Sequence, residues 1–290
     1  MLEIRPLASD SSGTRSMATY VETSDIAIVI DPAVALGPRR YRLPPHPLEF
    51  QRMETHWGLI KNAAKGAEIL VVTHYHYDHH DPGEPQLYRD KRVFLKHPRD
   101  KINKSQKERA AYFLERIEGY PREVEYSDEG EYEFGGSKIR FSQAVSHGPG
   151  TRLGYVIQVS IRDGDECFVF TSDIEGPCVS EQVEFIIEED PTVVYIDGPL
   201  SYMLGYRYSH KSLEKSLENM IRILRETRAE RLIVDHHLLR DLRWRDIIKP
   251  VFDEASERGK EVLTSAEFSG VENDMLEARR KELYSNSYKI

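Results

Sequence analysis

The chain has 290 residues, which is enough for one large domain or two ordinary ones. Its net charge of −9 argues against an indiscriminate nucleic-acid binder, which normally carries a basic surface. The sequence shows no leader-like start and no apolar run near eighteen residues, and its two cysteines are too few for a disulfide framework. We therefore expect a cytoplasmic protein that does not enter a membrane.

Strand-like and helix-like patterns cover most of the chain. The predicted strands are Leu2–Arg5, Met17–Glu22, Ile26–Ile30, Ile69–Thr73, Val93–Lys96, Glu131–Phe134, Lys138–Ala144, Gly154–Ile161, Phe168–Thr171, Val193–Ile196 and Leu232–Val234. The predicted helices are Leu48–Lys65, Asn103–Glu118, Ser180–Glu188, Ser212–Glu226, Leu242–Glu257 and Val271–Tyr284. Early strands follow one another closely and later ones alternate with helices, which favours a layered α/β sandwich with helices outside two facing sheets. No linker-like segment divides the chain, so we predict one domain over residues 1–290.

The most informative segment directly follows the apolar run Ile69–Val72 and reads Thr-His-Tyr-His-Tyr-Asp-His-His. Side chains two apart in an extended segment point the same way, so His74 and His76 can bind one metal ion. Asp78 and His79, around the following turn, can reach a second ion. Imidazole and carboxylate suit a divalent ion such as zinc. The alternative is a solvated polar loop that holds several histidines by chance.

One loop cannot complete two metal sites, and further candidate ligands follow later apolar runs. His147 comes after the alternating run 139–145, and Asp173 comes after the run 167–171. His236 and His237 follow the run 231–234. A ligand-type residue at each strand end predicts that these segments meet at one site.

The order of these residues, with Asp31 ahead of them, resembles the five-motif series of the metallo-β-lactamase superfamily. The resemblance extends from the strand before Asp31 to His236 and covers nearly the whole chain. The stretch 6–46, with Ser-Met-Ala-Thr at 16–19 and Ile-Asp-Pro at 30–32, is similar to an uncharacterised, largely archaeal branch of that superfamily. The resemblance implies a four-layer αββα sandwich of two mixed sheets with outer helices and metals at one sheet edge.

The resemblance also implies a hydrolase with two divalent metal ions, zinc first and manganese or iron as alternatives, and a metal-bridging hydroxide as nucleophile. It assigns the first ion to His74, His76 and His147, the second to Asp78, His79 and His236, and the bridge to Asp173. Asp78 and Asp173 are thereby expected to serve catalysis as well.

Three further residues have open roles. His237 competes with His236 for the last ligand position, and we favour His236 because it follows the strand more directly. Asp31 is expected to support the histidine loop through hydrogen bonds, although a turn carboxylate before Pro32 explains it equally well. His80 is an additional histidine that the motif does not include, and it is expected to lie beside the ligands or in solvent.

The segment 197–211 is expected to help select the substrate. Tyr206, Arg207 and Lys211, together with Lys96, are candidate substrate contacts because they offer positive charge and an aromatic face. His210 resembles in placement a histidine of the tRNA 3′-processing members that assists departure of the leaving group, which makes it a third catalytic candidate. The alternative is a turn with exposed aromatic residues.

Departures from known branches narrow the reaction class. An aspartate at 173 replaces the cysteine of true β-lactamases, and His76 replaces the glutamate of flavo-diiron proteins, whose flavin domain has no room here. We expect a hydrolase of phosphoesters or phosphodiesters, whether in a nucleotide, a nucleic acid or a phosphorylated metabolite. The alternatives are a carboxyl-ester, thioester or lactone hydrolase and a binding module that retains the fold without catalysis. The sequence does not indicate an oligomeric state.

Overall fold

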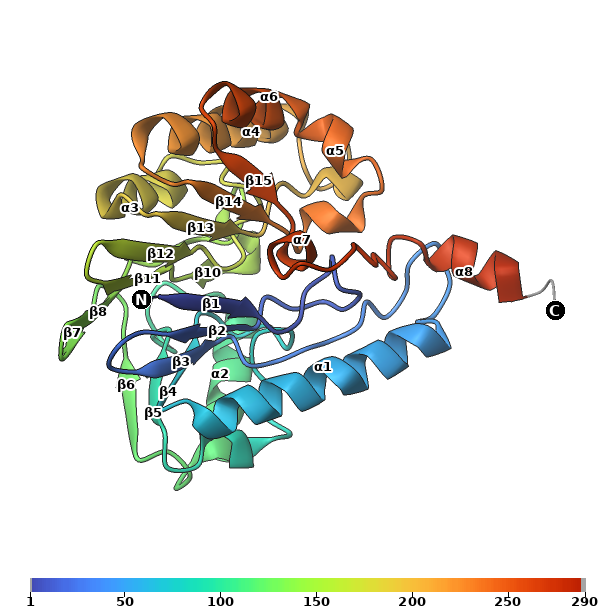
Figure 1. Cartoon of the computed structure of the whole chain (residues 1–290). Helices are drawn as coiled ribbons and strands as arrows, with labels where there is room; N and C mark the ends of the chain where they lie inside the picture. The colour runs from blue at the N-terminus through green and yellow to red at the C-terminus, as the bar shows by residue number, and fades with distance from the viewer. Residues whose placement is uncertain (1, 288–290) are drawn as a thin grey trace.

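The computed structural model describes residues 2–287, and Met1 and residues 288–290 of the predicted domain lie outside the described residues. Two β-sheets face each other, and helices cover both outer faces (Figure 1). One sheet is covered by α1 (Pro47–Gly66) and α2 (Lys104–Ile117). The other is covered by α3 (Glu181–Glu189), α4 (His210–Glu226) and α6 (Lys249–Glu257). This arrangement confirms the predicted four-layer sandwich.

The first sheet, within residues 2–287, has the strand order β1-β2-β3-β4-β5-β6. Strands β1 to β3 pair antiparallel, whereas β3, β4, β5 and β6 run parallel. The strands are β1 (Glu3–Pro6), β2 (Thr19–Glu22), β3 (Ala27–Ile30), β4 (Ile69–Val72), β5 (Arg92–Leu95) and β6 (Glu123–Tyr126).

The second sheet, over the same described range, has the order β15-β14-β13-β12-β11-β8-β7. Strands β12 to β15 run parallel, and β11, β8 and β7 are antiparallel. The strands are β7 (Glu131–Phe134), β8 (Ser137–Phe141), β11 (Val159–Asp163), β12 (Glu166–Phe170), β13 (Val193–Ile196), β14 (Arg231–Val234) and β15 (Glu261–Leu263). Strands β9 (Val145–Ser146) and β10 (Tyr155–Val156) pair with each other as a separate antiparallel two-stranded sheet.

Shorter helices connect these layers. They are η1 (Pro85–Tyr88), η2 (Thr151–Leu153), η3 (Ser201–Met203), η4 (Leu238–Arg240), α5 (Trp244–Ile247), α7 (Ser265–Phe268) and α8 (Arg280–Ser287). Among residues 2–287, no helix combines the length and the apolar character that crossing a bilayer requires.

The core lies between the sheets and beneath the helices. Residues such as Ile28 and Val71 of the first sheet pack with Ile139, Phe168 and Phe170 of the second in one buried cluster. Separate apolar clusters lie under α3, α4 and α6 and under α1 and α2. Burial of apolar surface on both faces explains why β3, β4 and β12 read as near-continuous apolar runs in the sequence.

Parallel pairing determines where the polar strand ends meet. The carboxyl ends of parallel strands lie at the same edge of a sheet, and ligands of open α/β sheets bind there. Asp31 follows β3, Thr73 and His74 follow β4, and Asp173 follows β12. Asp197 follows β13, and the His236–His237 pair follows β14. The fold therefore brings these side chains from both sheets to one edge.

Several predicted boundaries are wrong. The sequence analysis missed β6 and β15, which are short sheet edges with polar residues. The predicted strand Gly154–Ile161 is two strands, because the amide of Ile157 leaves the ladder and donates to the carbonyl of Thr73. The predicted helix Leu242–Glu257 is split into α5 and α6, and Pro250, which lacks an amide hydrogen, starts the second piece.

The predicted helix Val271–Tyr284 is also wrong over its first half, since α8 begins only at Arg280. Side chains of the non-helical stretch pair with distant segments instead. Asp274 pairs with Arg52 at 2.9 Å, and Glu277 pairs with Arg15 at 2.6 Å. These tertiary contacts override a weak helical pattern.

The C-terminal segment is also joined to the first helix by a buried ion pair, which predicts a measurable contribution to stability. The guanidinium of Arg280 donates to Glu49 at 2.7 and 2.6 Å and also to the carbonyl of Gly37, and both paired side chains are almost completely buried. Arg280→Met leaves Glu49 buried without its partner, so urea unfolding should show a loss of about 3–5 kcal/mol.

The neighbouring Arg279 supplies the matched control. It pairs with Asp274 and Glu282 at the surface, where such pairs contribute about 0–1 kcal/mol. Equal losses from Arg279→Met and Arg280→Met would contradict a specific role for the buried pair.

Candidate metal centre

The histidine loop leaves β4 and is held by Asp31. One oxygen of the Asp31 carboxylate accepts the amide of Thr73 at 2.8 Å, and the other accepts the Thr73 hydroxyl at 2.6 Å. The amides of His79 and His80 both donate to the carbonyl of His76, which closes one tight turn. This turn directs Asp78 and His79 to the same side as His74.

All seven predicted ligands lie together. Ligand atoms of His74, His76, His147 and Asp173 lie within 4.8 Å of one another, and so do those of Asp78, His79 and His236. These residues follow β4, β9, β12 and β14, so both sheets contribute to the two groups.

The carboxylate of Asp173 lies between the two groups. Its Oδ2 atom is 3.7 Å from the Nε2 atom of His74, 3.4 Å from that of His147 and 3.2 Å from that of His79. Its Oδ1 atom is 3.3 Å from the Nε2 atom of His236. One side chain thus contacts members of both groups, as a bridging ligand must.

Several inward-facing atoms lack hydrogen-bond partners among the described residues. They are the Nε2 atoms of His74, His79 and His147 and the Oδ1 atom of Asp173, all buried. Leaving a buried polar atom unpaired costs about 1–3 kcal/mol, and a convergent set of such atoms needs a common partner. Imidazole nitrogen and carboxylate oxygen are suitable ligands for a divalent transition metal. The residues therefore fit a metal centre.

The outward-facing Nδ1 atoms of three of these histidines have partners. The Nδ1 atom of His79 lies 2.7 Å from Asp31, and the Nδ1 atom of His74 lies 3.2 Å from the hydroxyl of Ser172. The Nδ1 atom of His236 lies 2.8 Å from Asp10. Such bonds fix the ring orientation and leave the Nε2 atoms of His74 and His79 free for a metal, whereas the Nε2 atom of His236 lies 3.0 Å from a guanidinium nitrogen of Arg240.

Sequence reasoning missed Asp10 and Arg240. Asp10 is almost completely buried between His236 and the guanidinium of Arg240, whose Nε atom donates to it at 2.8 Å. The local sequence Ser-Asp-Ser-Ser-Gly is typical of a surface turn, so nothing nearby signals a buried carboxylate. Only the tertiary structure brings residues 10 and 236 together.

Burial and neighbouring charge set different pKa values around the centre. Burial, aided by the charge of His147, lowers the pKa of His76 to about 3, and burial also keeps that of His74 well below its usual value. Both imidazoles are therefore neutral and can bind metal. Burial opposes protonation of His236 as well, but Asp173 and Asp10 outweigh it and raise its pKa to about 10. A divalent cation would replace the proton that these carboxylates favour.

His237 and His80 differ in their surroundings. The Nδ1 atom of His237 lies 2.7 Å from Asp197, and its ring lies beside that of His236. His237 also forms a possible ligand group with Asp173 and His236, so the choice between the two histidines stays a prediction. His80 is buried against Phe113, with its Nδ1 atom 2.9 Å from a carbonyl oxygen. Its ring therefore packs behind the loop.

Three backbone positions at the centre adopt left-handed conformations. Asp31, Ser172 and His236 have φ angles of 50°, 61° and 46°, and none of them is glycine. Residues with side chains adopt this conformation at a cost, and proteins retain it mainly where function or surrounding contacts require it. Each of these residues lies just after a strand, where the chain turns sharply toward the ligands.

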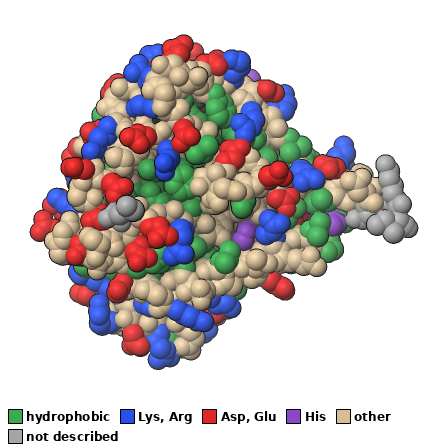
Figure 2. Space-filling view, viewed as in Figure 1, with side chains coloured by type: hydrophobic (Ala, Val, Ile, Leu, Met, Phe, Trp, Pro, Cys, Tyr) green, Lys and Arg blue, Asp and Glu red, His purple; other side chains and the backbone are tan. Residues whose placement is uncertain are grey.

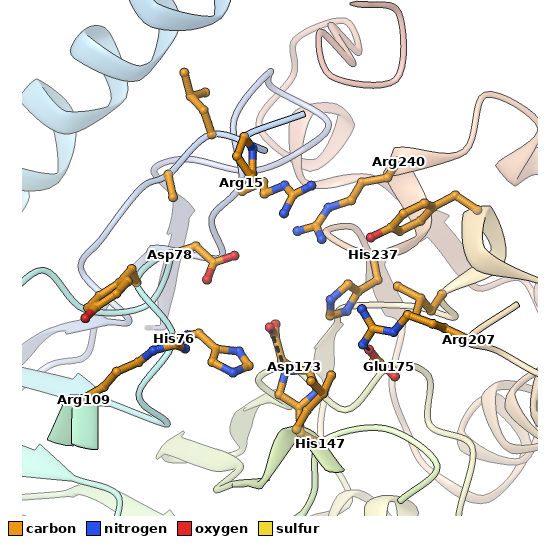
Figure 3. A pocket seen from close by; sticks show the side chains of 17 residues that line it. Arg15, His76, Asp78, Arg109, His147, Asp173, Glu175, Arg207, His237 and Arg240 are labelled. Carbon is orange, nitrogen blue, oxygen red and sulfur yellow. Dashed lines mark ion pairs between the residues drawn. The ribbon is translucent and has the colours of Figure 1, made fainter. Parts of the chain in front are cut away.

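A pocket of about 450 Å³ opens onto the ligands (Figure 3). His76, Asp78, His147 and Asp173 lie around one part of it, and the guanidinium groups of Arg15 and Arg240 lie on the opposite side. The remaining charged side chains at its wall are Arg109, Arg207 and Glu175. Four arginines therefore surround the candidate metal centre.

The predicted substrate contacts divide into two sets. Arg207 lines the metal pocket, and the exposed Tyr206 lines a pocket beside it. Lys96 is completely buried and pairs with Asp128 at 2.7 Å, so the structure does not support it as a substrate contact. Lys211 is exposed in the first turn of α4 and is absent from the lining of the metal pocket.

His210 is the first residue of α4, is exposed, and lines a different neighbouring pocket with Arg40 and Tyr41. Sequence placement alone suggested that it lies near the leaving group. That role stays a prediction, because the structure does not bring His210 into the ligand groups described above.

Solved structures share this fold at low sequence identity. Isothiocyanate hydrolase from Delia radicum gut bacteria has a TM-score of 0.54 at 15% identity, with 87% of this chain and 94% of that chain covered. The metallo-β-lactamase fold protein YhfI from Bacillus subtilis has a TM-score of 0.51 at 13% identity, with 91% and 96% covered. Tm1679, a metal-dependent hydrolase of the β-lactamase superfamily, has a TM-score of 0.52 at 14% identity, with 91% and 96% covered. These likenesses confirm the predicted metallo-β-lactamase fold.

No family model matches the chain, but whole-length relatives do. A UPF0282 protein of Korarchaeum cryptofilum is 52% identical over 284 residues, which cover 98% of this chain and 94% of the relative. A UPF0282 protein of Metallosphaera sedula is 48% identical over 288 residues, which cover 98% and 93%. These relatives confirm the predicted resemblance to a largely archaeal branch. With that identity along nearly its full length, the chain belongs to the UPF0282 family.

Proposed function

We propose that the protein is a hydrolase that uses two divalent metal ions and acts on a phosphoester or phosphodiester. The observation that carries the proposal is the set of buried, unpaired nitrogen and oxygen atoms that converge around Asp173. Tm1679, which shares the fold, is itself described as a metal-dependent hydrolase, and this agrees with the proposal.

In this proposal each ion has three ligands of its own and shares Asp173. The first ion is bound by His74, His76 and His147, and the second by Asp78, His79 and His236. A shared carboxylate offsets the repulsion between two cations that lie close together. We propose zinc for both sites, and manganese or iron(II) would accept the same nitrogen and oxygen ligands.

When bound, such ions would supply hydroxide near neutral pH and polarise the bond under attack. The chain's own residues orient the reaction. Asp31 and Asp10 hold two of the ligand rings in place, and the near-complete burial of His74 and Asp173 limits access by bulk water. Preorganised ligands of this kind need little rearrangement as the reaction proceeds.

The charge of the pocket favours phosphate chemistry. Arg207 contacts Glu175 only at 3.8 Å, so its guanidinium has capacity for a further anion. Arg109 lies over the ring of Tyr77 and faces the same pocket. Guanidinium groups bind phosphate oxygens through paired hydrogen bonds and stabilise the negative charge that develops on them. A neutral ester or lactone would leave this charge without a partner.

A substrate panel tests the reaction class. Metal-replete protein should hydrolyse bis-p-nitrophenyl phosphate at least tenfold faster than p-nitrophenyl acetate, γ-lactones or acyl thioesters, measured as kcat/KM. Zinc-loaded and manganese-loaded samples are compared in parallel. Faster turnover of lactones or thioesters would favour the carbonyl alternative, and no hydrolysis across the panel would favour the binding module.

Metal content tests the ligand assignment. Elemental analysis should find two divalent ions per chain, and His76→Ala should lose about one of them because the first site loses a ligand. The exposed His210 serves as the matched histidine control, since it belongs to neither ligand group. His210→Ala should keep both ions, and a leaving-group role for His210 would lower kcat without loss of metal. Equal loss of metal in both variants would contradict the assignment.

Asp10 provides a test of a contact that the sequence did not predict. Asp10→Asn removes the charge that orients the ring of His236, so the affinity of the second metal should fall about 10- to 100-fold in chelator competition. The first site should retain its affinity. Asp81→Asn is the control, because Asp81 lies beside the same loop and only accepts the amide of Gly83. Unchanged affinity in Asp10→Asn would show that Asp10 does not support the ligand.

A further inference from the structure

Two further pockets share wall residues with the metal pocket. A first flanking pocket of about 310 Å³ shares His147, Leu153, Glu175 and Arg207 with it. A second flanking pocket of about 400 Å³ shares Tyr202 and Arg240 with it. Because the two flanking pockets share different wall residues with the metal pocket, they adjoin it at different parts of its wall, and we refer to the three pockets together as the groove.

Each flanking pocket has a basic residue of its own that forms no ion pair among the described residues, although Glu175 lines the first pocket and Asp241 the second. Arg152 is exposed in the first pocket and has no ion pair among the described residues. In the second pocket, Arg40 lies between the rings of Tyr41 and Tyr202 at 4.8 and 4.4 Å and donates to the carbonyl of Arg240. Stacking on rings holds its guanidinium in place without neutralising its charge.

Two further arginines in the flanking pockets have only distant partners. Arg207 lies 3.8 Å from Glu175, and Arg243 lies 3.9 Å from Asp241 and is largely exposed. Other arginines form close pairs, as Arg225 does with Glu254 at 2.6 Å. On the face shown in Figure 2, basic and acidic side chains are interspersed over the surface. Although the whole chain has a net charge of −9, the groove contains arginines whose positive charge is available to a ligand.

An exposed tyrosine accompanies this charge in each of the three pockets. Tyr206 is 84% exposed in the first flanking pocket, Tyr77 is 48% exposed at the metal pocket, and Tyr41 is 47% exposed in the second flanking pocket. Exposed aromatic rings beside positive charge are typical of surfaces on which bases of a single strand stack, and two of these rings, Tyr41 and Tyr77, also lie against an arginine. A phosphorylated metabolite would use neither the outer tyrosines nor the outer arginines.

The depth of the centre restricts the form of the ligand. His74 and Asp173 are at most 2% exposed, so a phosphate must enter the pocket to reach them. The backbone of a duplex is held against its paired strand and cannot enter. A single strand can, and each pocket has the volume of a site for one small ligand.

We propose that the groove binds single-stranded nucleic acid across the metal centre, with the scissile phosphodiester at the metals and a neighbouring nucleotide in each flanking pocket. This inference rests on the proposed function and names its substrate class. In the reaction, the oxygen of water forms a bond to phosphorus, the bond from phosphorus to the leaving sugar oxygen breaks, and that oxygen receives a proton from the water. Arg40 and Arg152 bind the phosphates on the two sides.

Fluorescence anisotropy with metal-replete protein tests the inference directly. The probes are fluorescein-labelled twelve-nucleotide single strands of DNA and of RNA, the corresponding duplexes, and a labelled dinucleotide, with strand integrity checked on denaturing gels. We expect at least one single strand to bind tenfold or more tightly than its duplex and than the dinucleotide. Duplex or dinucleotide binding as tight as that of both single strands would overturn the proposal.

Arg40→Gln and Arg152→Gln test the two flanking pockets separately. Each should weaken single-strand binding roughly three- to tenfold and lower the slope of log affinity against log salt by about one, since each removes one phosphate contact. Arg122→Gln is the matched control. Arg122 is exposed just before β6, at the amino end of a parallel strand and thus at the opposite sheet edge. Equal effects in all three variants would overturn the proposal.

The outcomes separate this inference from the proposed function. Hydrolysis of bis-p-nitrophenyl phosphate without preferential single-strand binding would overturn the inference and leave the hydrolase proposal standing. Tight single-strand binding that depends on Arg40 and Arg152, without hydrolysis of any phosphodiester, would support the groove and contradict the hydrolase.

Discussion

The structure depends on compensating a group of buried ionisable side chains at the junction of two sheets. Asp31 and Asp173 and the rings of His74, His79 and His236 are all almost completely removed from water. Burial of an uncompensated charge or of an unpaired polar atom is costly, so such a group persists only where partners are supplied. Carboxylates behind the rings supply some of the partners, and the inward-facing nitrogen and oxygen atoms fit a divalent metal. The same buried side chains thus determine both the stability of this edge of the protein and its capacity to bind metal.

Parallel strands bring candidate ligands from distant parts of the chain to one edge of the two sheets. Strands β3 and β4 deliver Asp31 and the histidine loop from the first sheet, and β12 and β14 deliver Asp173 and His236 from the second. The strands are rigid and buried, whereas the loops beyond them are free to vary. Candidate ligands therefore follow buried strands directly or in the next loop, whereas the arginines and tyrosines that line the groove lie in loops and helices.

Sequence reasoning found what is encoded locally and missed what is encoded only by contact. Histidines and aspartates at or shortly after the ends of apolar runs, in the order of a known motif series, can be recognised from sequence, and the seven predicted ligands lie together in the structure. Asp10 and Arg240 have no local signature, because their roles arise from pairing with each other and with His236. Lys96 shows the opposite failure, since its positive charge suggested a substrate contact, whereas that charge is paired with Asp128. The edge strand β6 was missed because it contains polar residues and therefore lacks the apolar alternation by which strands are recognised in a sequence.

The distribution of ligands over two sheets has a mechanical consequence. The separation between the two ligand groups depends on how the sheets pack on one another, and the buried cluster between them includes Ile28 and Val71 of the first sheet and Ile139 and Phe168 of the second. Small misplacements of reacting groups can reduce rates by about 100-fold, even when they originate far from the chemistry. The buried interior therefore sets the spacing of the candidate metal ligands, and a change in side-chain volume between the two sheets would change the distances between the two ligand groups.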